Sequence, residues 1–251
     1  MVAHYLRKIS GNKRHRLLNL RLARYLAFVA GATNAGGFLA VQQYTSHMSG
    51  IVASIGNQLV LGHYHLILSS LLALLSFLTG AACTAILVNW GKRKGIQSLF
   101  ALPLVVEALL LVCFGLVGAR LPMQTPELMM MTSILLCFLM GLHNALITKI
   151  SGAEIRTTHV TGMVTDLGIE LGKLFYWNKK SAAPKQEGVR ANRMKMLSLF
   201  SLIASFLVGG IVGSMGFEKI GFLFTLPFAA LLFILAIVPV WDDIVKPRKS
   251  P

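Results

Sequence analysis

Residues 45–50 read Thr-Ser-His-Met-Ser-Gly, and residues 157–162 read Thr-Thr-His-Val-Thr-Gly. Each motif is followed by an apolar, helix-like pattern, and neither contains Lys, Arg, Asp or Glu. Ser and Thr favour the N-terminal cap of a helix, and Gly lets another backbone approach closely. Each motif therefore predicts the start of a helix, and their likeness predicts that the chain contains one unit twice.

Three further pairs of similar segments occur in the same order in both halves. They are GATNA at 31–35 with GLHNA at 141–145, SFLTG at 76–80 with SFLVG at 205–209, and LFALP at 99–103 with LFTLP at 223–227. We interpret residues 24–120 and 127–241 as two three-span repeats, the second with a basic cytoplasmic loop at 178–195. Residues 1–23 form a basic N-terminal segment, and residues 242–251 form a cytoplasmic tail.

The composition is typical of a membrane protein. Of the 251 residues, 55% are hydrophobic and 13% are charged, whereas a soluble domain has about 25% charged residues. Residues 25–91 contain no Asp, Glu, Lys or Arg. As one helix this stretch would be about 100 Å long, roughly three hydrocarbon thicknesses. Most cytosolic enzymes are thereby excluded.

The basic residues predict the orientation in the membrane. Four clusters, within residues 7–24, 92–94, 173–195 and 246–249, hold 20 of the 24 Lys and Arg residues. Basic residues concentrate on the cytoplasmic side, so both termini are predicted to be cytoplasmic. The apolar stretch 25–91 must then cross the membrane an even number of times.

Two spans, residues 24–44 and 65–90, fit that stretch and leave residues 45–64 between them. This remainder is too apolar for an exposed loop, and we predict a half-helix or re-entrant segment buried in protein. The other predicted spans are residues 99–119, 128–148, 196–217 and 220–241. The predicted fold class is therefore all-α integral membrane, with six transmembrane helices.

Each predicted half has three spans, an odd number, so the second half enters the membrane from the opposite side. This is a 3+3 inverted-topology repeat, which is common in secondary transporters. Residues 157–177 supply the half-helix of the second half. The two helix starts would converge near the membrane centre, where their N–H groups suit an anion or the polar end of a small solute.

The predicted substrate-binding site combines residues of both halves. They are Asn34, Thr45, His47, Ser49, Gly50, Asn144, Thr157, His159, Thr161, Gly162 and Asp166. The alternative is that the hydroxyls only cap two helices and the glycines aid packing. The paired His47 and His159 either contact solute or relay protons, or are ordinary hydrogen-bonding residues. Asn34 and Asn144 either line the site or bond between helices.

Three acidic residues, Glu107, Asp166 and Glu170, fall in or near predicted membrane segments. Asp166 is matched by the neutral Ser54, so the repeat is asymmetric at this position. An acid there indicates proton or cation coupling. Alternatively, Asp166 lies at the cytoplasmic edge and pairs with Lys173 or a nearby Arg. We expect Glu170 at that edge.

No feature of the sequence indicates a metal, a cofactor or nucleic acid. The cysteines lie outside the motifs, and no predicted helix carries a His-x-x-x-His pair. A nucleic-acid binder gathers basic residues on one face among aromatics, whereas here they separate apolar spans. No nucleophile stands at a convincing spacing from a base, so we do not expect an enzyme.

The expected function is a small-solute transporter or channel that works by alternating access around the central site. A membrane scaffold or assembly protein without transport is the main alternative, and a membrane-embedded enzyme is a further one. The expected partners are membrane lipids, an unknown small solute and a second copy in a homodimer. Small residues spaced by four predict close helix contacts, either between the matched spans or in that dimer. They are Ser76, Gly80 and Thr84, and Ser205, Gly209 and Gly213.

The chain resembles the YoaK-like family of bacterial multi-pass membrane proteins, a family of unknown function. The resemblance rests on GATNAGGF at 31–38, HMSG at 47–50, HVTG at 159–162 and TDLG at 165–168, and it extends over about residues 24–241. It implies a location in the cytoplasmic membrane of a bacterium. That family often has Asp where this chain has Asn, at the fourth residue of GATNAGGF, so no role that needs a charge is carried over.

Overall fold

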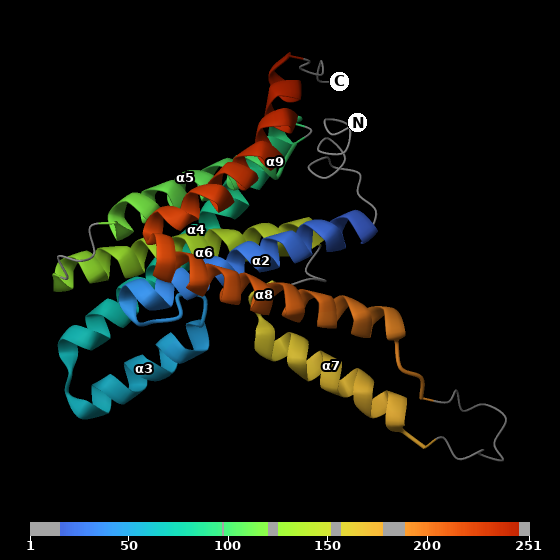
Figure 1. Ribbon diagram of the computed structural model, residues 1–251, viewed down its shortest axis with the longest axis horizontal. Helices are drawn as coiled ribbons and strands as arrows, with labels where there is room; N and C mark the ends of the chain where they lie inside the picture. Colours follow the sequence, from blue (N-terminus) through green and yellow to red (C-terminus); the bar gives the residue numbers. More distant parts are fainter. Residues whose placement is uncertain (1–15, 97, 120–124, 152–156, 178–188, 246–251) are drawn as a thin grey trace.

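The computed structural model describes residues 16–96, 98–119, 125–151, 157–177 and 189–245. These residues form eight α-helices and one 3-10 helix (Figure 1). They are α2 (Arg16–Val41), α3 (Met48–Leu61), α4 (Tyr64–Arg93), α5 (Ala101–Gly118), α6 (Pro126–Ser151), α7 (Val160–Phe175), α8 (Arg193–Ile220), η2 (Phe222–Phe224) and α9 (Thr225–Val245). The predicted N-terminal segment, basic loop and C-terminal tail lie partly outside the described residues.

Four of the described helices, α4, α5, α6 and α8, are long and apolar enough to cross a membrane. Helix α2 matches the first predicted span but includes Arg21, Arg24 and Asn34. The last predicted span corresponds to a shorter apolar stretch, Phe222–Ile237. The all-helical prediction is therefore confirmed, whereas six complete crossings stay a prediction.

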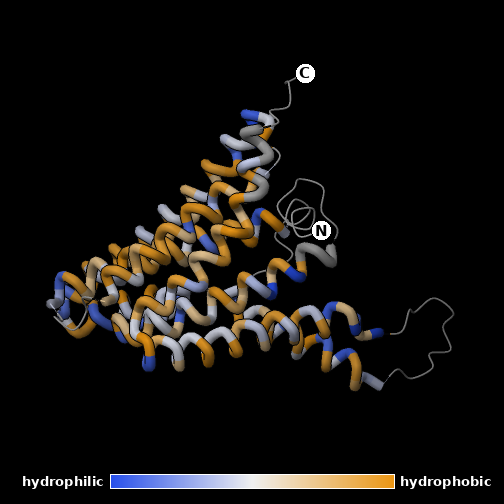
Figure 2. The backbone as a smooth tube through the Cα atoms, turned by 45° about the horizontal axis from the view of Figure 1, so that its top comes forward, coloured by the Kyte–Doolittle hydropathy of each residue, from blue (hydrophilic) through white to orange (hydrophobic). Residues whose placement is uncertain are grey.

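The helices expose large apolar side chains, as expected of a surface that faces lipid. Leu78 on α4 and Leu207 on α8 are 63% and 61% exposed. Figure 2 shows hydrophobic residues along the helices and hydrophilic ones near several helix ends. Trp90 near the end of α4 and Trp177 after α7 are exposed, as is common where helices meet the membrane interface. Together these features indicate a multi-pass integral membrane protein.

The long helices pack mainly in three pairs, α2 with α8, α4 with α6, and α5 with α9. Helices α5 and α9 lie together on one side of the central helices, and α3 and α7 lie on the other (Figure 1). Helix α3 packs on α4, and α7 packs on α8. Each short helix therefore forms a hairpin with the long helix that follows it.

Glycines allow the closest of these helix contacts. A side-chain carbon at any of four glycines would collide with a backbone carbonyl of the facing helix. The pairs are Gly31 with Phe206, Gly80 with Phe138, Gly141 with Phe77, and Gly209 with Phe28. On α4, the hydroxyls of Ser76 and Thr84 donate to the carbonyls of Ile134 and Leu142 at 2.6 and 3.0 Å. Small residues thus bring the backbones of α4 and α6 together.

The two small-residue stripes do not pack on each other, so the alternative in which the matched spans contact each other is wrong. The stripe on α4 faces α6, and the stripe on α8 faces α2. The reason is that each facing helix supplies its own glycine, at Gly141 or Gly31, so close approach is possible from both sides. Each of these close contacts therefore joins a helix of the first half to a helix of the second half.

The two short helices start inside the molecule. Their N-terminal ends face each other near the middle, and the helices run apart from there (Figure 1). Their N-cap residues are His47 and His159, so both helices begin within the repeated motifs. The chain turns back toward α3 at Gln42, whose φ of 53° is unusual for a residue other than glycine.

Candidate functional site

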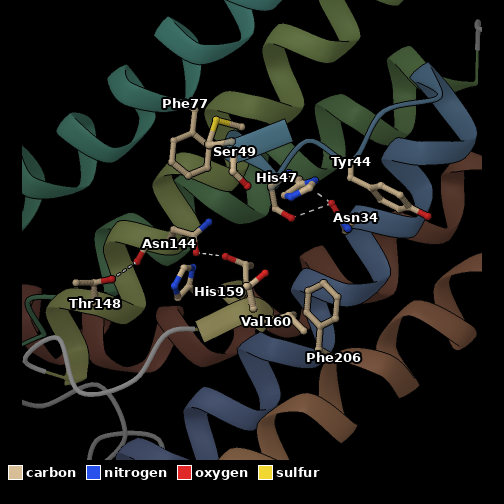
Figure 3. Close-up of a pocket in the computed structure, with 14 residues that line it drawn as sticks. Asn34, Tyr44, His47, Ser49, Phe77, Asn144, Thr148, His159, Val160 and Phe206 are labelled. Carbon is tan, nitrogen blue, oxygen red and sulfur yellow. Dashed lines mark hydrogen bonds between the residues drawn. The ribbon is translucent and has the colours of Figure 1, made fainter. Parts of the chain in front are cut away.

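A cavity of about 980 Å³ lies between the starts of α3 and α7 (Figure 3). Both motifs line it, together with residues of the four central helices. The lining consists of Asn34, Tyr44, Ser46, His47, Met48, Ser49, Phe77, Asn144, Thr148, Thr158, His159, Val160, Thr161 and Phe206. No Asp, Glu, Lys or Arg is among them, so its polarity comes from hydroxyl, amide and imidazole groups.

Two asparagines tie the motifs to the long helices in the same way. The Ser46 hydroxyl donates to Asn34 Oδ1 at 3.0 Å, and the Thr158 hydroxyl donates to Asn144 Oδ1 (Figure 3). Asn144 Nδ2 also donates to the carbonyl of Met140 at 2.8 Å. The asparagines therefore both line the cavity and form hydrogen bonds between elements, two roles that were predicted as alternatives.

Each N-cap histidine folds over the glycine of its own motif. A side-chain carbon at Gly50 would lie 2.8 Å from His47 Nδ1, and one at Gly162 would lie 2.5 Å from His159 Nε2. The glycines thus make room for the imidazole rings, which line the cavity.

Neither short helix has a side-chain cap at its N-terminus. The alternative that the motif hydroxyls cap these helices is therefore wrong. The hydroxyls of Ser46 and Thr158 bond to asparagines instead. Uncapped first-turn N–H groups and the positive ends of two helix dipoles consequently meet at the cavity.

The structure brings six of the predicted site residues to the cavity wall. They are Asn34, His47, Ser49, Asn144, His159 and Thr161. The other five lie elsewhere. Thr45 and Thr157 are fully buried, and Gly50 and Gly162 lie under the histidine rings. Asp166 lies farther along α7 and pairs with Lys195 of α8 at 3.2 Å.

Asp166 forms an ion pair, as the alternative of a position at the cytoplasmic edge predicted. Its partner is Lys195, however, and not Lys173 or an Arg. Glu170, one turn further, is buried and accepts hydrogen bonds from the Asn192 N–H and Lys173 Nζ at 2.8 and 2.9 Å. The Asn192 bond, followed by the Lys173 bond, lowers the pKa of this carboxyl. These two acids therefore link α7 to α8 and to the residue before it, Asn192. Neither of them lines the cavity.

Most of the chain matches a known protein family. The family model of DUF1275, described as a protein of unknown function, matches residues 22–238. The matched range includes both motifs and the long helices of both halves. The chain belongs to the DUF1275 family. No curated protein and no solved structure matches it. It is thus a multi-pass helical membrane protein of a family of unknown function, as the resemblance implied.

A buried polar network lies directly behind the second motif of this DUF1275 protein. His143 Nδ1 is 2.6 Å from Glu107 Oε1, and His143 Nε2 is 3.2 Å from the Thr157 hydroxyl. All three side chains are 0–1% exposed. The predicted site included Thr157 but neither of its partners. Two features of the sequence indicated them: Glu107 is an acid within an apolar span, and His143 stands where the first repeat has Thr33.

The buried network is not a metal centre as it stands. Among the described residues, no three His, Cys, Asp or Glu side chains come together in a way that could hold a metal ion.

Proposed function

We propose that this DUF1275 protein is a transporter or channel for a small solute, with its binding site in the central cavity. The cavity carries the proposal, because equivalent residues of both repeated motifs line it and it lies among helices that indicate a membrane protein. Its volume of about 980 Å³ is at the upper end of the range for ligand pockets.

The proposal includes a six-span, 3+3 inverted-topology repeat. Its support is the pairing of the helices: α2 with α8 and α4 with α6 are the same contact if the halves are related by a two-fold axis. The glycine contacts repeat in that manner, because Gly31 and Phe206 match Gly141 and Phe77 at offsets of 110 and 129 residues. Inverted repeats of this kind place their site between the halves.

The lining predicts the class of solute. Hydroxyl, amide and imidazole groups with two helix N-termini suit a small polar solute that is neutral or carries one negative charge. Phe77 and Phe206, which occupy matched positions, add apolar walls on two sides. A cationic solute is disfavoured because the wall holds no carboxylate to pair with it.

We propose that the protein lies in the cytoplasmic membrane of a bacterium with both termini inside, and that it is related to the YoaK-like proteins that its motifs resemble. The support for the orientation is the distribution of Lys and Arg. Cysteines introduced at Glu218 and Lys94 in whole cells test it. We expect a membrane-impermeant maleimide to label Glu218→Cys and not Lys94→Cys, and labelling of Lys94→Cys alone would contradict this orientation.

The function is tested by cavity access and by flux. In a variant without its three native cysteines, Ser49→Cys and Thr161→Cys are placed on the cavity wall, and Leu207→Cys on the exposed face of α8 is the control. We expect the first two to react with a water-soluble maleimide in proteoliposomes and the control to stay unreactive. Unreactive cavity cysteines would favour a dry scaffold over a transporter.

Flux is measured in the same proteoliposomes with a panel of small anions, monocarboxylates, amino acids and polyols. We expect at least one solute to produce a flux that His47→Ala and His159→Ala both reduce. A reactive cavity with no flux across the panel would leave a binding protein and contradict transport of these classes.

A further inference from the structure

We propose that Glu107, His143 and Thr157 form a buried proton-binding site whose occupancy changes how α6 holds the start of α7. The inference deepens the proposed function by naming a proton as the coupling ion, and it rests on that function only for the role of the cavity. Three separate segments meet at this site: α5 supplies Glu107, α6 supplies His143, and Thr157 precedes α7. Helix α7 then carries one wall of the cavity.

The site is built for one exchangeable proton. Glu107 Oε1 lies 2.6 Å from His143 Nδ1, so one hydrogen is shared between them. The other carboxyl oxygen, Glu107 Oε2, is buried and has no hydrogen-bond partner. A buried carboxyl group with one unsatisfied oxygen is costly as a structural element alone. Such groups in membrane proteins commonly mark proton paths.

Proton uptake reverses one hydrogen bond. Without the extra proton, neutral His143 donates Nδ1–H to the Glu107 carboxylate, and Nε2 accepts the hydroxyl hydrogen of Thr157. In the proton-bound state of this site, the proton that enters from water is held at Nε2. The pair is then a carboxylate with an imidazolium or, if the Nδ1 hydrogen moves to Glu107 Oε1, a carboxylic acid with a neutral imidazole. Nε2 then donates to Thr157 Oγ1, and the hydroxyl hydrogen must find another acceptor. The net charge of the site changes by one, and release returns the proton to water.

The reversed bond acts on the cavity through the adjacent residues. His143 and Asn144 are neighbours on α6, and Thr157 and Thr158 are neighbours before α7. The two hydrogen bonds therefore join the same two segments side by side, His143 with Thr157 on the buried side and Asn144 with Thr158 on the cavity side. A change in the buried bond alters the geometry in which the cavity-side bond forms.

The first half lacks this device. The residues matched to His143 and Thr157 are Thr33 and Thr45, whose hydroxyls are buried without a hydrogen-bond partner. The LFALP and LFTLP segments, at 99–103 and 223–227, are 124 residues apart, and by that offset Leu231 matches Glu107. Only the cavity-side bond, between Asn34 and Ser46, is kept there.

The other ionisable groups of the described residues form no ion pair with Glu107 or His143, which pair with each other. Helices α2 and α4, which pack against α6, carry charged or titratable side chains at Arg21, Arg24 and Tyr25 (α2) and at Tyr64, His65, Cys83, Lys92 and Arg93 (α4). The remaining ones on α5 and α6 themselves are Cys113, Glu127, Cys137 and Lys149. Arg24 bonds to Ser201. The described side chains of α9 include none.

The first test is infrared difference spectroscopy of the full-length protein in lipid bilayers, perfused alternately at about pH 8 and about pH 5. The wild type is expected to show carboxyl and imidazole changes. Glu107→Gln is expected to lose one carboxyl component, and His143→Gln is expected to shift it. An unchanged carboxyl difference spectrum in Glu107→Gln would overturn the proton-binding site.

The second test measures the movement and does not depend on the stability of those two variants. Spin labels at Val164 of α7 and Met131 of α6, in the variant without native cysteines, report their distance by pulsed electron paramagnetic resonance. We expect the distance distribution to change between the two pH values. Thr157→Val should abolish that change, and the matched Thr45→Val should preserve it. A pH-independent distribution in the parent protein, or equal loss in both variants, would overturn the link to α7.

Neither measurement uses a solute, so both distinguish this inference from the proposed function. A proton-dependent shift in a protein without flux would retain the proton site and contradict transport. Flux in a protein without the shift would support transport and contradict the proton site.

Discussion

The two motifs form the same hydrogen bonds at the cavity. They differ at the buried residue next to each of these bonds, which is Thr45 in the first motif and Thr157 in the second. At the cavity, Ser46 bonds to Asn34 and Thr158 bonds to Asn144. Behind it, the second half places His143 and Glu107 against Thr157, whereas the first half places two threonines there that have no hydrogen-bond partners. The shared part shapes the cavity, and the differing part is ionisable in one half only.

A second difference of the same kind lies where each short helix meets the next long one. In the first half Gln58 Oε1 lies 2.8 Å from His63 Nδ1. At the matched place in the second half, Glu170 accepts from the backbone N–H of Asn192 and from Lys173. A Gln–His pair thus corresponds to a cluster of Glu170 with Lys173. A charged cluster at the second junction agrees with the prediction that this junction lies on the cytoplasmic side.

The largest expected effect concerns a contact that both halves share. Gly31→Ala and Gly141→Ala each place a methyl group against the carbonyl of Phe206 or Phe77, with no room for it. Because the backbone of the facing helix must move to admit the methyl group, each change should destabilise the protein by about 3 kcal/mol or more. The measurement is unfolding in mixed micelles, together with the yield of monodisperse protein.

The matched controls for that prediction are Gly56→Ala and Gly168→Ala. Both glycines lie in the short helices with open space around them, and alanine is the better helix former by about 1 kcal/mol. They should therefore be neutral or stabilising. A large loss for Gly31→Ala with none for Gly141→Ala would break the equivalence of the two halves.

Much of this arrangement could be predicted from the sequence because it rests on repetition and hydropathy. The motifs correctly predicted two helix starts, at Met48 and Val160, since a turn between apolar runs has few other solutions. The partners of the small-residue stripes were not predictable, because Gly80 and Gly209 are compatible with any close backbone. Nor was the Glu107–His143 contact, because residues 36 positions apart on different helices meet only through packing.

The second expected effect distinguishes the two junctions. Glu170→Gln should weaken the α7–α8 hairpin more than Gln58→Ala weakens the α3–α4 hairpin, because Glu170 is a buried, charge-assisted acceptor and Gln58 is exposed. The folded-state pKa of Glu170 is lowered, so its contribution is present above the unfolded pKa and is lost as the pH falls through the folded value. Thermal stability measured down the acid range should drop less in Glu170→Gln than in the wild type. An equal drop would contradict this role.

A third, smaller effect should be the same in both halves. Ser46→Ala and Thr158→Val each remove the hydroxyl that bonds to the cavity asparagine. Hydrogen bonds between membrane segments contribute about 0.6 kcal/mol on average, so both variants should lose about that much. The measurement is the same micelle unfolding. A loss in one half alone would mean that the two cavity-side bonds are not equivalent.

The smallest expected effect is also the most direct comparison of the halves. Thr45→Val removes a buried hydroxyl that has no partner, so its free energy of unfolding should change by about zero or rise slightly. Thr157→Val removes the partner of His143 Nε2 and leaves a buried ring nitrogen unsatisfied, so it should lose about 0.6 kcal/mol or more. Thr157→Ser, which keeps the hydroxyl, should recover most of that loss. Since valine and threonine have nearly the same shape, packing is matched and the difference reports the hydrogen bond alone. Equal values for the two valine variants would mean that the histidine behind the second motif does not distinguish it from the first.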